Sequence, residues 1–380
     1  MKTDSGLMLL GVGGGGCRLA AAAFALHGEG LRALGIDTDA VAVRGVSGLR
    51  CMLLGQARLD GQGTGGDVIK GRQATLDDSE NLRREMDGVR TVVIVACLGG
   101  GTGAGATPEL LRIFRDMGIV TLCFVTRPFG FEDAVRRQSA ERCLPMFEGN
   151  ADTLVVVPLD ELHAQTGIER VAAANEAAAR LLGEGLTLLW RILLTPGFVR
   201  LDPNRLRAML LRGKTARLGL AAATGADRAG QLVARLRQAP LLRGEALGNA
   251  RAMALGVLAG ADLRLAELDI LMQQVQAACK RDCHIEMGTV LDARFEGRIE
   301  LVALVFENWV SSEDAAPQDG VPAEAADVLS EGALGVRGKT ARSSKLRRNP
   351  GRFRGVEPTV HAGESLDIPT YCRRKIALER

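Results

Sequence analysis

Aromatic residues are scarce in this chain: they make up 3% of its 380 residues, with two Trp and one Tyr. Proteins that bind single-stranded nucleic acid stack its bases on aromatic side chains beside basic ones, and the sequence has no such cluster. The formal net charge of +3 is also low for a nucleic-acid-binding protein of this length. We therefore expect no nucleic-acid partner.

Long apolar runs are also missing. The longest, Val92–Leu98, has the length of a strand, whereas a helix that spans a bilayer needs about 20 apolar residues. The N-terminal residues Met1–Gly6 lack the pattern of a signal peptide. Most of the eight cysteines stand singly in apolar stretches, as buried, reduced thiols do. The sequence thus predicts a cytoplasmic protein with no direct membrane span.

A complete pattern of metal ligands is absent as well. Cys279, Cys283 and His284 stand close together, but no second pair of ligands occurs at zinc-finger spacing. We therefore expect these residues to have a packing role, and we predict no metal site.

The first half of the chain alternates short apolar runs with helical patterns. The runs lack polar alternation, which is typical of parallel strands covered on both faces. Such a sheet binds ligands at the carboxyl ends of its strands. We expect strands at Leu7–Leu10, Leu34–Ile36, Thr91–Leu98, Ile119–Thr126 and Thr153–Val157, and helices at Leu19–Leu26 and about Pro108–Met117.

A long helix, Ile168–Leu194, is predicted next, and Thr195–Gly197 would end it. The region that follows mixes strand and helix patterns. The predicted fold class is α/β: a parallel-sheet nucleotide-binding domain (residues 1–167), a long central helix (168–195) and a second α/β domain with a mixed sheet (196–310). Its expected strands are Leu218–Ala223, Ala252–Leu258, Ile285–Leu291 and Ile299–Phe306, and its helices are Leu206–Leu211, Arg228–Gln238 and Leu265–Ala278.

The composition then changes. Ser311–Glu331 is acidic, Arg337–Arg354 is basic, and neither block has enough apolar residues to offset the entropy of ordering. We therefore predict a disordered linker at residues 311–365. A short apolar and aromatic segment, Leu366–Arg374, follows, and this predicts a partner-docking peptide at residues 366–380.

Two glycine-rich loops follow predicted strands: Gly11–Gly16 and Gly99–Gly105. Glycine lets the backbone approach a phosphate, and a helix N-terminus supplies N–H donors. The first loop alone also fits the G-x-G-x-x-G fingerprint, with Asp37 or Asp39 about 20 residues on, so an NAD-dependent oxidoreductase is one alternative. No acid–base pair for hydride transfer accompanies it. Two such loops on one sheet favour a nucleoside di- or triphosphate held from two sides.

Motifs along nearly the whole chain resemble those of the tubulin/FtsZ family. Gly99–Gly105 is similar to the GGGTGTG signature, with Ala104 in place of the second threonine, and Gly11–Gly16 is similar to the first nucleotide loop. Further resemblances, in chain order, are Gly35–Ala40 (NTDA), Gly61–Asp67 (a third glycine loop), Arg127–Glu132 with Arg136 (KPFxFEGxxR), Leu194–Asp202 (the loop that enters the next subunit's nucleotide site), Ala239–Leu242, Gly288–Asp292 and Leu366–Arg374 (LDIPxFLR).

This resemblance implies a self-polymerising cytoskeletal protein that binds GTP, with Mg²⁺, and hydrolyses it between adjacent subunits. The glycine loops would hold the phosphates, and Glu132 and Arg136 would contact the ribose and guanine. Their i, i+4 spacing allows both on one helical face, although a surface ion pair is the alternative. The nucleotide-binding residues implied are Gly13, Gly14, Gly15, Gly16, Arg18, Gly99, Gly100, Gly101, Thr102, Gly103, Ala104, Gly105, Glu132, Arg136 and Asn175.

The sequence departs from the family pattern near the nucleotide. Arg18 and Asp37 stand where the family has Asn, and Leu159 replaces the Asn of its IPND segment. On the long helix, Asn175 resembles a family residue about one turn early, and Arg180 occupies an acidic position. More residues therefore support phosphate binding than support guanine selectivity.

The subunit-contact loop departs as well. The family pattern is N-x-D-x-x-D, whose acids orient the attacking water, and here Asp202 lies between Arg200 and Arg205. The resemblance implies that Asp202 is supplied to the neighbouring subunit as the catalytic carboxylate, with Arg200 and Arg205 beside the triphosphate. Because a single carboxylate is left to orient the water, we predict slow hydrolysis. The alternative is that one of the arginines stabilises the charge of the transition state. A filament scaffold that hydrolyses GTP weakly or not at all is the second hypothesis.

The resemblance also implies partners and a location. Head-to-tail contacts between copies of the chain do not close, so they produce filaments. The segment Leu366–Arg374 would dock onto a membrane-tethering division protein, with Ile368, Pro369 and Tyr371 as apolar anchors. The protein would therefore form the division ring in the cytoplasm at midcell.

Overall fold

The computed structural model describes residues 6–27, 32–161, 171–194, 197–242, 245–310, 360–361 and 364–365. The chain divides into two compact units, Met1–Ala333 and Leu334–Arg380. In the second unit, the described residues form two short antiparallel strands, β11 (Val360–His361) and β12 (Glu364–Ser365). The predicted docking peptide and most of the predicted linker lie outside the described residues.

The first sheet has six parallel strands in the order β3-β2-β1-β4-β5-β6. Alternate residues of its central strand β4 face opposite cores: Val93 and Val95 pack into one apolar cluster, and Val92 and Ile94 into the other. This double burial explains why the strands lack polar alternation, and the predicted parallel sheet is confirmed. The strands are β1 (Leu7–Val12), β2 (Arg32–Asp37), β3 (Cys51–Leu53), β4 (Thr91–Cys97), β5 (Val120–Arg127) and β6 (Thr153–Pro158).

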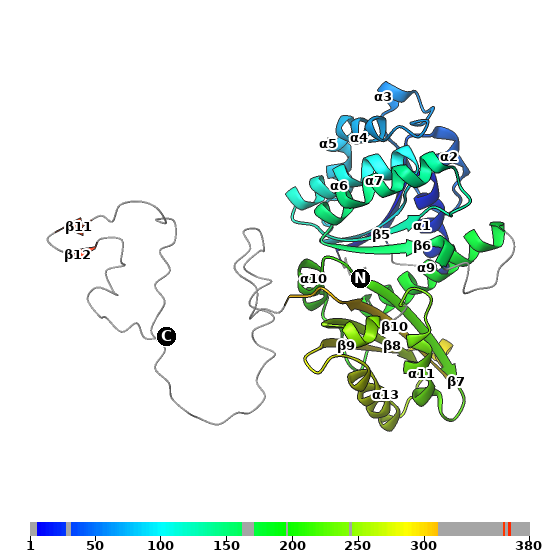
Figure 1. Ribbon diagram of the computed structural model, residues 1–380, viewed down its shortest axis with the longest axis vertical. Coiled ribbons are helices and arrows are strands. Elements are labelled where there is room, and N and C mark those ends of the chain that lie inside the picture. The colour runs from blue at the N-terminus through cyan, green and yellow to red at the C-terminus, as the bar shows by residue number, and fades with distance from the viewer. Residues whose placement is uncertain are drawn as a thin grey trace. The chain divides into compact units, whose positions relative to one another are not determined.

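Helices cover both faces of this sheet (Figure 1). One face packs against α1 and, further along the chain, α9 and α10; the other packs against α4, α5, α6 and α7. The helices are α1 (Gly13–His27), α2 (Ala40–Gly45), α3 (Gln56–Leu59), α4 (Val68–Asp77), α5 (Ser79–Glu85), α6 (Gly101–Asp116), α7 (Ala134–Asn150), α9 (Val171–Leu194) and α10 (Pro203–Arg212).

Two predicted helix starts are wrong. The helices expected at Leu19 and Pro108 begin at Gly13 and Gly101, inside the glycine loops, and Pro108 lies within α6. Packing explains the second case, because α4 and α6 approach backbone to backbone. A Cβ on Gly105 would lie 2.0 Å from the carbonyl oxygen of Val68 in α4. Tertiary contact therefore outweighs the low helix propensity of glycine.

The long helix α9 joins the two halves of the first unit. It packs against α1 on one side and against the second sheet on the other. Gly183 and Gly185 do not interrupt it, and Gly185 lies close to Leu218, whose side chain would be 2.7 Å from a Cβ at that position. In Figure 1, the first sheet lies in the upper half of this unit and the second sheet in the lower half, with α9 between them.

The second sheet is mixed, as predicted. Its order is β7-β10-β8-β9; β10 is antiparallel to β7 and β8, and β8 is parallel to β9. Its strands are β7 (Arg217–Thr224), β8 (Ala252–Ala259), β9 (His284–Leu291) and β10 (Arg298–Phe306), with helices α11 (Arg228–Arg237), α12 (Ala246–Asn249) and α13 (Leu265–Ala278) and the 3₁₀ turn η1 (Ala293–Phe295).

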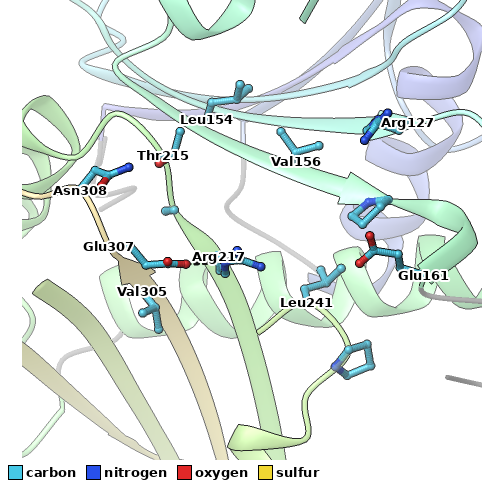
Figure 2. Close-up of a pocket in the computed structure, with 13 residues that line it drawn as sticks. Arg127, Leu154, Val156, Glu161, Thr215, Arg217, Leu241, Val305, Glu307 and Asn308 are labelled. Atoms are coloured by element: carbon cyan, nitrogen blue, oxygen red, sulfur yellow. Dashed lines mark hydrogen bonds and ion pairs between the residues drawn. The ribbon is translucent and has the colours of Figure 1, made fainter. Parts of the chain in front are cut away.

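The two sheets meet where β6 pairs with the residues just before β7. Leu154 N donates to Lys214 O and Ala216 N donates to Leu154 O, both at 2.9 Å. Beyond this bridge the edges diverge around a cleft of about 320 Å³ (Figure 2). On the β7 side, Arg217 Nε bonds Glu307 Oε1 at 2.6 Å. None of the helices among the described residues combines the length and apolar composition that a membrane span requires.

Candidate functional site

A cleft of about 860 Å³ opens at the carboxyl ends of the parallel strands. It is lined by the last residues of β1, β2 and β4, which are Val12, Asp37 and Cys97, and by Thr126 near the end of β5. The strand order reverses between β1 and β4, so the cleft lies where open α/β sheets bind ligands.

Two helices begin at this cleft. The N-cap of α6 is Gly100, and no side chain bonds the first N–H groups of that helix. A Cβ on Gly100 would meet no atom within 4 Å. The first four residues of α1 are all glycine, so they carry no side chain that could cap it. Both N-termini therefore present backbone donors and a partial positive charge to the cleft, which suits an anion such as phosphate.

The predicted nucleotide residues divide into two groups. Ten line the cleft: Gly13, Gly14, Gly15, Arg18, Gly100, Gly101, Thr102, Gly103, Glu132 and Arg136.

The other predicted residues of the two loops pack against neighbouring elements. Gly16, Gly99, Ala104 and Gly105 do not line the cleft. A Cβ on Gly16 would lie 2.3 Å from Val95 O of β4, so glycine lets α1 lie against the sheet. The glycine loops thus combine ligand-facing and packing positions.

A hydroxyl pair joins the loops after β2 and β4. Thr38 Oγ1 and Thr102 Oγ1 are 2.7 Å apart, and Asp37 Oδ1 accepts a hydrogen bond from Thr38 N at 2.8 Å. Asp37 is only 4% exposed, and this burial raises the pKa of its carboxyl above the ordinary value. The cleft therefore contains a buried acid that holds its proton more tightly than a free aspartate does.

Two other acids near the cleft cap helices. Asp39 Oδ1 accepts from Val41 N at 2.7 Å at the start of α2. Asp67 Oδ1 accepts from Ile69 N at 2.8 Å at the start of α4. These N-caps fix the loops that close the cleft beside α1 and α6.

Glu132 and Arg136 form the ion pair that the sequence left open as an alternative. Arg136 Nε lies 3.0 Å from Glu132 Oε2, and Glu132 Oε1 accepts from Phe129 N at 2.9 Å. The two side chains do not share a helical face, although their spacing would allow it, because α7 begins at Ala134, after Glu132. Beside them, the ring of Phe131 is 65% exposed and stacks on Phe129 with centroids 4.9 Å apart.

The predicted subunit-contact loop lies away from this cleft. Strand β9 holds it: Val199 N donates to Thr289 Oγ1 at 2.8 Å, and Thr289 N donates to Val199 O at 2.7 Å. Asp202 is the N-cap of α10, and its Oδ1 accepts from Asn204 N at 2.8 Å. The loop is therefore anchored at Val199 and at Asp202.

The two arginines of this loop differ. Arg205 Nη1 pairs with Glu286 Oε1 at 3.2 Å, whereas the side chain of Arg200 is exposed. Neither arginine lines the cleft of its own chain, and nor does Asp202.

The expected residues on the long helix and the candidate metal ligands do not line the cleft in the described part of the structure. Asn175 belongs to α9, but its side chain lies outside the described part of the structure, and Arg180 is exposed. Among the described residues, no group of three or more His, Cys, Asp and Glu side chains could hold a metal ion. His284 stacks on Trp309 with ring centroids 5.1 Å apart.

Sequence reasoning missed several residues of the cleft, among them Cys97, Thr126 and Leu19. Cys97 and Thr126 lie near the ends of strands whose positions were predicted, so the rule that ligands bind at carboxyl ends could have identified them. Burial raises the pKa of the Cys97 thiol, which makes it a poor nucleophile.

Residues 7–167 match the model of the Tubulin/FtsZ family, GTPase domain, and residues 214–307 match that of the FtsZ family, C-terminal domain. The chain belongs to the tubulin/FtsZ family. It is a GTP-binding cytoskeletal protein of that family.

Relatives and solved structures agree with this assignment. The chain is 28% identical to cell division protein FtsZ of Pseudomonas putida, over 97% of this chain and 89% of the relative. It is also 28% identical to cell division protein FtsZ 1 of Archaeoglobus fulgidus, over 83% of this chain and 85% of the relative.

Among solved structures, a mutant FtsZ of M. jannaschii matches with a TM-score of 0.73 at 25% identity, covering 79% of this chain and 90% of that one. The GTPγS-bound protofilament of CetZ2 from Haloferax volcanii shares the fold, with a TM-score of 0.68 at 21% identity, covering 86% of this chain and 97% of that one.

Proposed function

We propose that the chain binds GTP in the cleft at the strand ends, polymerises head to tail and hydrolyses the nucleotide slowly between subunits. The observation that carries the proposal is the pair of helix N-termini, α1 and α6, that begin at one cleft with no side-chain cap on α6. Their N–H groups bind the phosphates, with Gly13–Gly15 on one side and Gly100–Gly103 on the other.

Mg²⁺ accompanies the nucleotide. Mg²⁺ prefers oxygen ligands and is usually held by phosphates together with one or two carboxylates. The cleft offers oxygens of this kind on Asp37 and Asp39 and on the hydroxyls of Thr38 and Thr102, so its residues fit the ion. When bound, the ion neutralises phosphate charge.

The base end of the cleft is formed by different side chains. The exposed ring of Phe131 offers a surface for stacking, and the Glu132–Arg136 ion pair lies beside it. Arg18, on α1, also lines the cleft. We assign the ribose and guanine to this end, with Asn175 on α9 as a further contact.

Filaments form when the loop of one subunit covers the cleft of the next. Asp202 of the subunit that supplies the loop orients the water that attacks the γ-phosphate bound in the cleft of the next subunit. The exposed Arg200 of the same loop adds a positive charge beside that nucleotide. Arg205 is held by Glu286 within its own subunit, so it contributes less to the pocket. A single carboxylate beside one free arginine supports slow hydrolysis.

The relatives named cell division protein support a role in the division ring, in the cytoplasm at midcell. In this role, Leu366–Arg374 docks onto a membrane-tethering division protein. Deletion of residues 366–380 should leave polymerisation intact and abolish recruitment to such a partner. Loss of polymerisation in that variant would refute this separation of roles.

The test of the main proposal combines pelleting with phosphate release on the same sample of full-length protein and GTP. Filaments with slow phosphate release are expected. Filaments without phosphate release would favour the alternative, a non-hydrolysing scaffold. A soluble monomer with bound GTP at every concentration would overturn polymerisation, and binding of NAD(H) in place of GTP by equilibrium dialysis would overturn the nucleotide assignment.

A further inference from the structure

The subunit-contact loop lies directly on strand β9, with backbone against backbone. A Cβ on Gly197 would lie 1.4 Å from Thr289 O, so the start of the loop can approach the strand this closely only with glycine. On the strand, a Cβ on Gly288 would lie 2.7 Å from the Cβ of Leu201, whose side chain is 1% exposed. Residues 197–201 therefore rest on β9 at two points where no side chain separates them.

Thr289 adds hydrogen bonds to this contact. Its Oγ1 accepts from Val199 N at 2.8 Å, and its backbone N–H donates to Val199 O at 2.7 Å. Because Thr289 is only 2% exposed, little solvent is available to replace its hydroxyl. The neighbours of Val199 in the loop, Phe198 and Arg200, are both exposed, so neither buries a side chain that would hold this part of the loop. The loop at Val199 therefore depends on its bonds to Thr289.

Strand β9 also holds the chain beyond the loop. Asp202 caps α10 through its bond with Asn204 N, and one turn later Arg205 Nη1 lies 3.2 Å from Glu286 Oε1. Thr289 and Glu286, both on β9, thus hold the chain before and after Asp202. The place of the Asp202 carboxylate is therefore set by this strand through the residues on either side.

We propose that Thr289 is a positioning residue for hydrolysis between subunits. Its hydroxyl fixes the loop at Val199, and the loop carries Asp202 to the γ-phosphate of the next subunit. This inference rests on the proposed function of Asp202. A carboxylate that orients water must lie within hydrogen-bond reach of it, and a misplacement of about 1 Å can cost about 100-fold in rate. Thr289 contacts neither the nucleotide nor the water, so it acts only through Asp202.

Thr289→Val tests the hydroxyl, because valine has a similar volume but cannot accept from Val199 N. We expect this variant to release phosphate about tenfold more slowly per pelleted subunit. Thr289→Ser retains the oxygen and should stay within about twofold of the wild-type rate. GTP binding by unassembled subunits, measured by equilibrium dialysis, should be unchanged in both, because Asp202 and its loop do not line the cleft of their own chain. If Thr289→Val does not fold, Thr289→Ala, which leaves room for water beside Val199 N, should show the same loss.

Thr121 offers a matched control. It is 1% exposed, and its Oγ1 accepts from Asp152 N at 3.0 Å, so Thr121→Val removes the same kind of bond from β5 of the first sheet. Urea unfolding should show that Thr121→Val and Thr289→Val both lose stability, whereas Thr121→Val should release phosphate at the wild-type rate per filament subunit. An equal loss of release in Thr121→Val would mean that lower stability alone slows hydrolysis, and it would overturn the proposal.

A double variant shows whether Thr289 acts through Asp202. In an Asp202→Asn background, Thr289→Val should cause no further loss of phosphate release. A further loss of about tenfold there would overturn the proposal, because Thr289 would then act independently of the carboxylate. Wild-type release by folded Thr289→Val, beside slow release by Asp202→Asn, would overturn this inference alone. Wild-type release by Asp202→Asn would overturn the proposed role of Asp202 and this inference with it.

Discussion

The helices α6 and α10 begin in opposite ways. The N-cap of α6 is Gly100, with no side chain on its first N–H groups, whereas the N-cap of α10 is Asp202, whose Oδ1 accepts from Asn204 N at 2.8 Å. Gly100 leaves the backbone N–H donors of α6 open to the cleft. In α10, the residue after the N-cap is Pro203, which has no backbone N–H to donate.

This difference shows how one backbone feature serves two purposes. An open N-terminus is ready for a phosphate from solution, and no rearrangement is needed. A capped N-terminus instead holds its own carboxylate in a fixed position at the start of a helix. Asp202 is therefore both a structural cap and, in the proposed filament, a group presented to the neighbouring nucleotide.

The largest expected effect separates these two roles of Asp202. Asparagine caps helices as well as aspartate does but carries no charge. We expect Asp202→Asn to keep the free energy of unfolding and to lower phosphate release by filaments by about 100-fold or more. Asp202→Ala should show the same loss of release and also lower the free energy of unfolding by about 1 kcal/mol.

Phosphate release is measured per pelleted subunit, so that a change in assembly does not count as a change in hydrolysis. Urea unfolding of the same preparations gives the stability. If Asp202→Asn released phosphate at the wild-type rate, the residue would act as a helix cap alone.

A second pair of variants tests the two kinds of glycine in α6. A Cβ at position 105 would lie 2.0 Å from Val68 O, so Gly105→Ala should force α4 and α6 apart and cost about 1–3 kcal/mol of stability. A Cβ at position 100 meets no atom within 4 Å, so Gly100→Ala should leave stability within about 0.5 kcal/mol of the wild type.

In the cleft, however, that methyl group would occupy space beside the open N–H groups. We therefore expect Gly100→Ala to weaken GTP binding by roughly tenfold, or about 1.4 kcal/mol, in equilibrium dialysis. Equal GTP affinity in Gly100→Ala and wild type would place the phosphates elsewhere.

A third pair compares the arginines beside the capped helix. Arg200 is exposed and Arg205 is paired with Glu286. Loss of an exposed charge near the neighbour's triphosphate should raise the critical concentration of Arg200→Ala about three- to tenfold, without a fall in release per filament subunit. Arg205→Ala should change the critical concentration less, because Arg205 pairs with Glu286 of its own subunit. A drop of about 1000-fold in release by Arg200→Ala would instead identify a transition-state arginine.

The sequence predicts the strands better than it predicts where helices begin. The apolar run Thr91–Leu98 matches β4 to within a residue, because the strand is buried along nearly its whole length. Leu265–Ala278 coincides with α13, because its apolar residues recur at helical spacing. Glycine runs indicate loops, and so α6 was expected to begin at Pro108. The run is helical in the structure, and the close contact of Gly105 with α4, which no local pattern indicates, accounts for it.

The sequence predicted only part of the site, because it shows loop composition but not tertiary contacts. Loop composition indicates phosphate binding, but composition alone does not separate glycines that face the cleft, such as Gly100, from those that face another helix, such as Gly105. Nor does it show that Asp202 is a helix cap or that Glu286 pairs with Arg205, because these contacts depend on tertiary geometry.

The smallest expected effect concerns Asp37, the buried acid beside Thr38 and the open end of α6. Its carboxyl pKa is raised above the ordinary 3.8, chiefly by burial, so just above that pH the folded chain keeps a proton that the unfolded chain has lost. Stability therefore falls as the pH rises through the window above 3.8 and levels off beyond the raised pKa.

Asp37→Asn keeps the Oδ1 acceptor and removes the titration, so its urea midpoint should vary less between about pH 4 and 7 than that of the wild type. At pH 7 the variant should gain less than about 1 kcal/mol of stability. Asp39→Asn, which retains the cap of α2, is the matched control and should follow the wild type. An unchanged slope in Asp37→Asn would mean that another group produces the pH dependence.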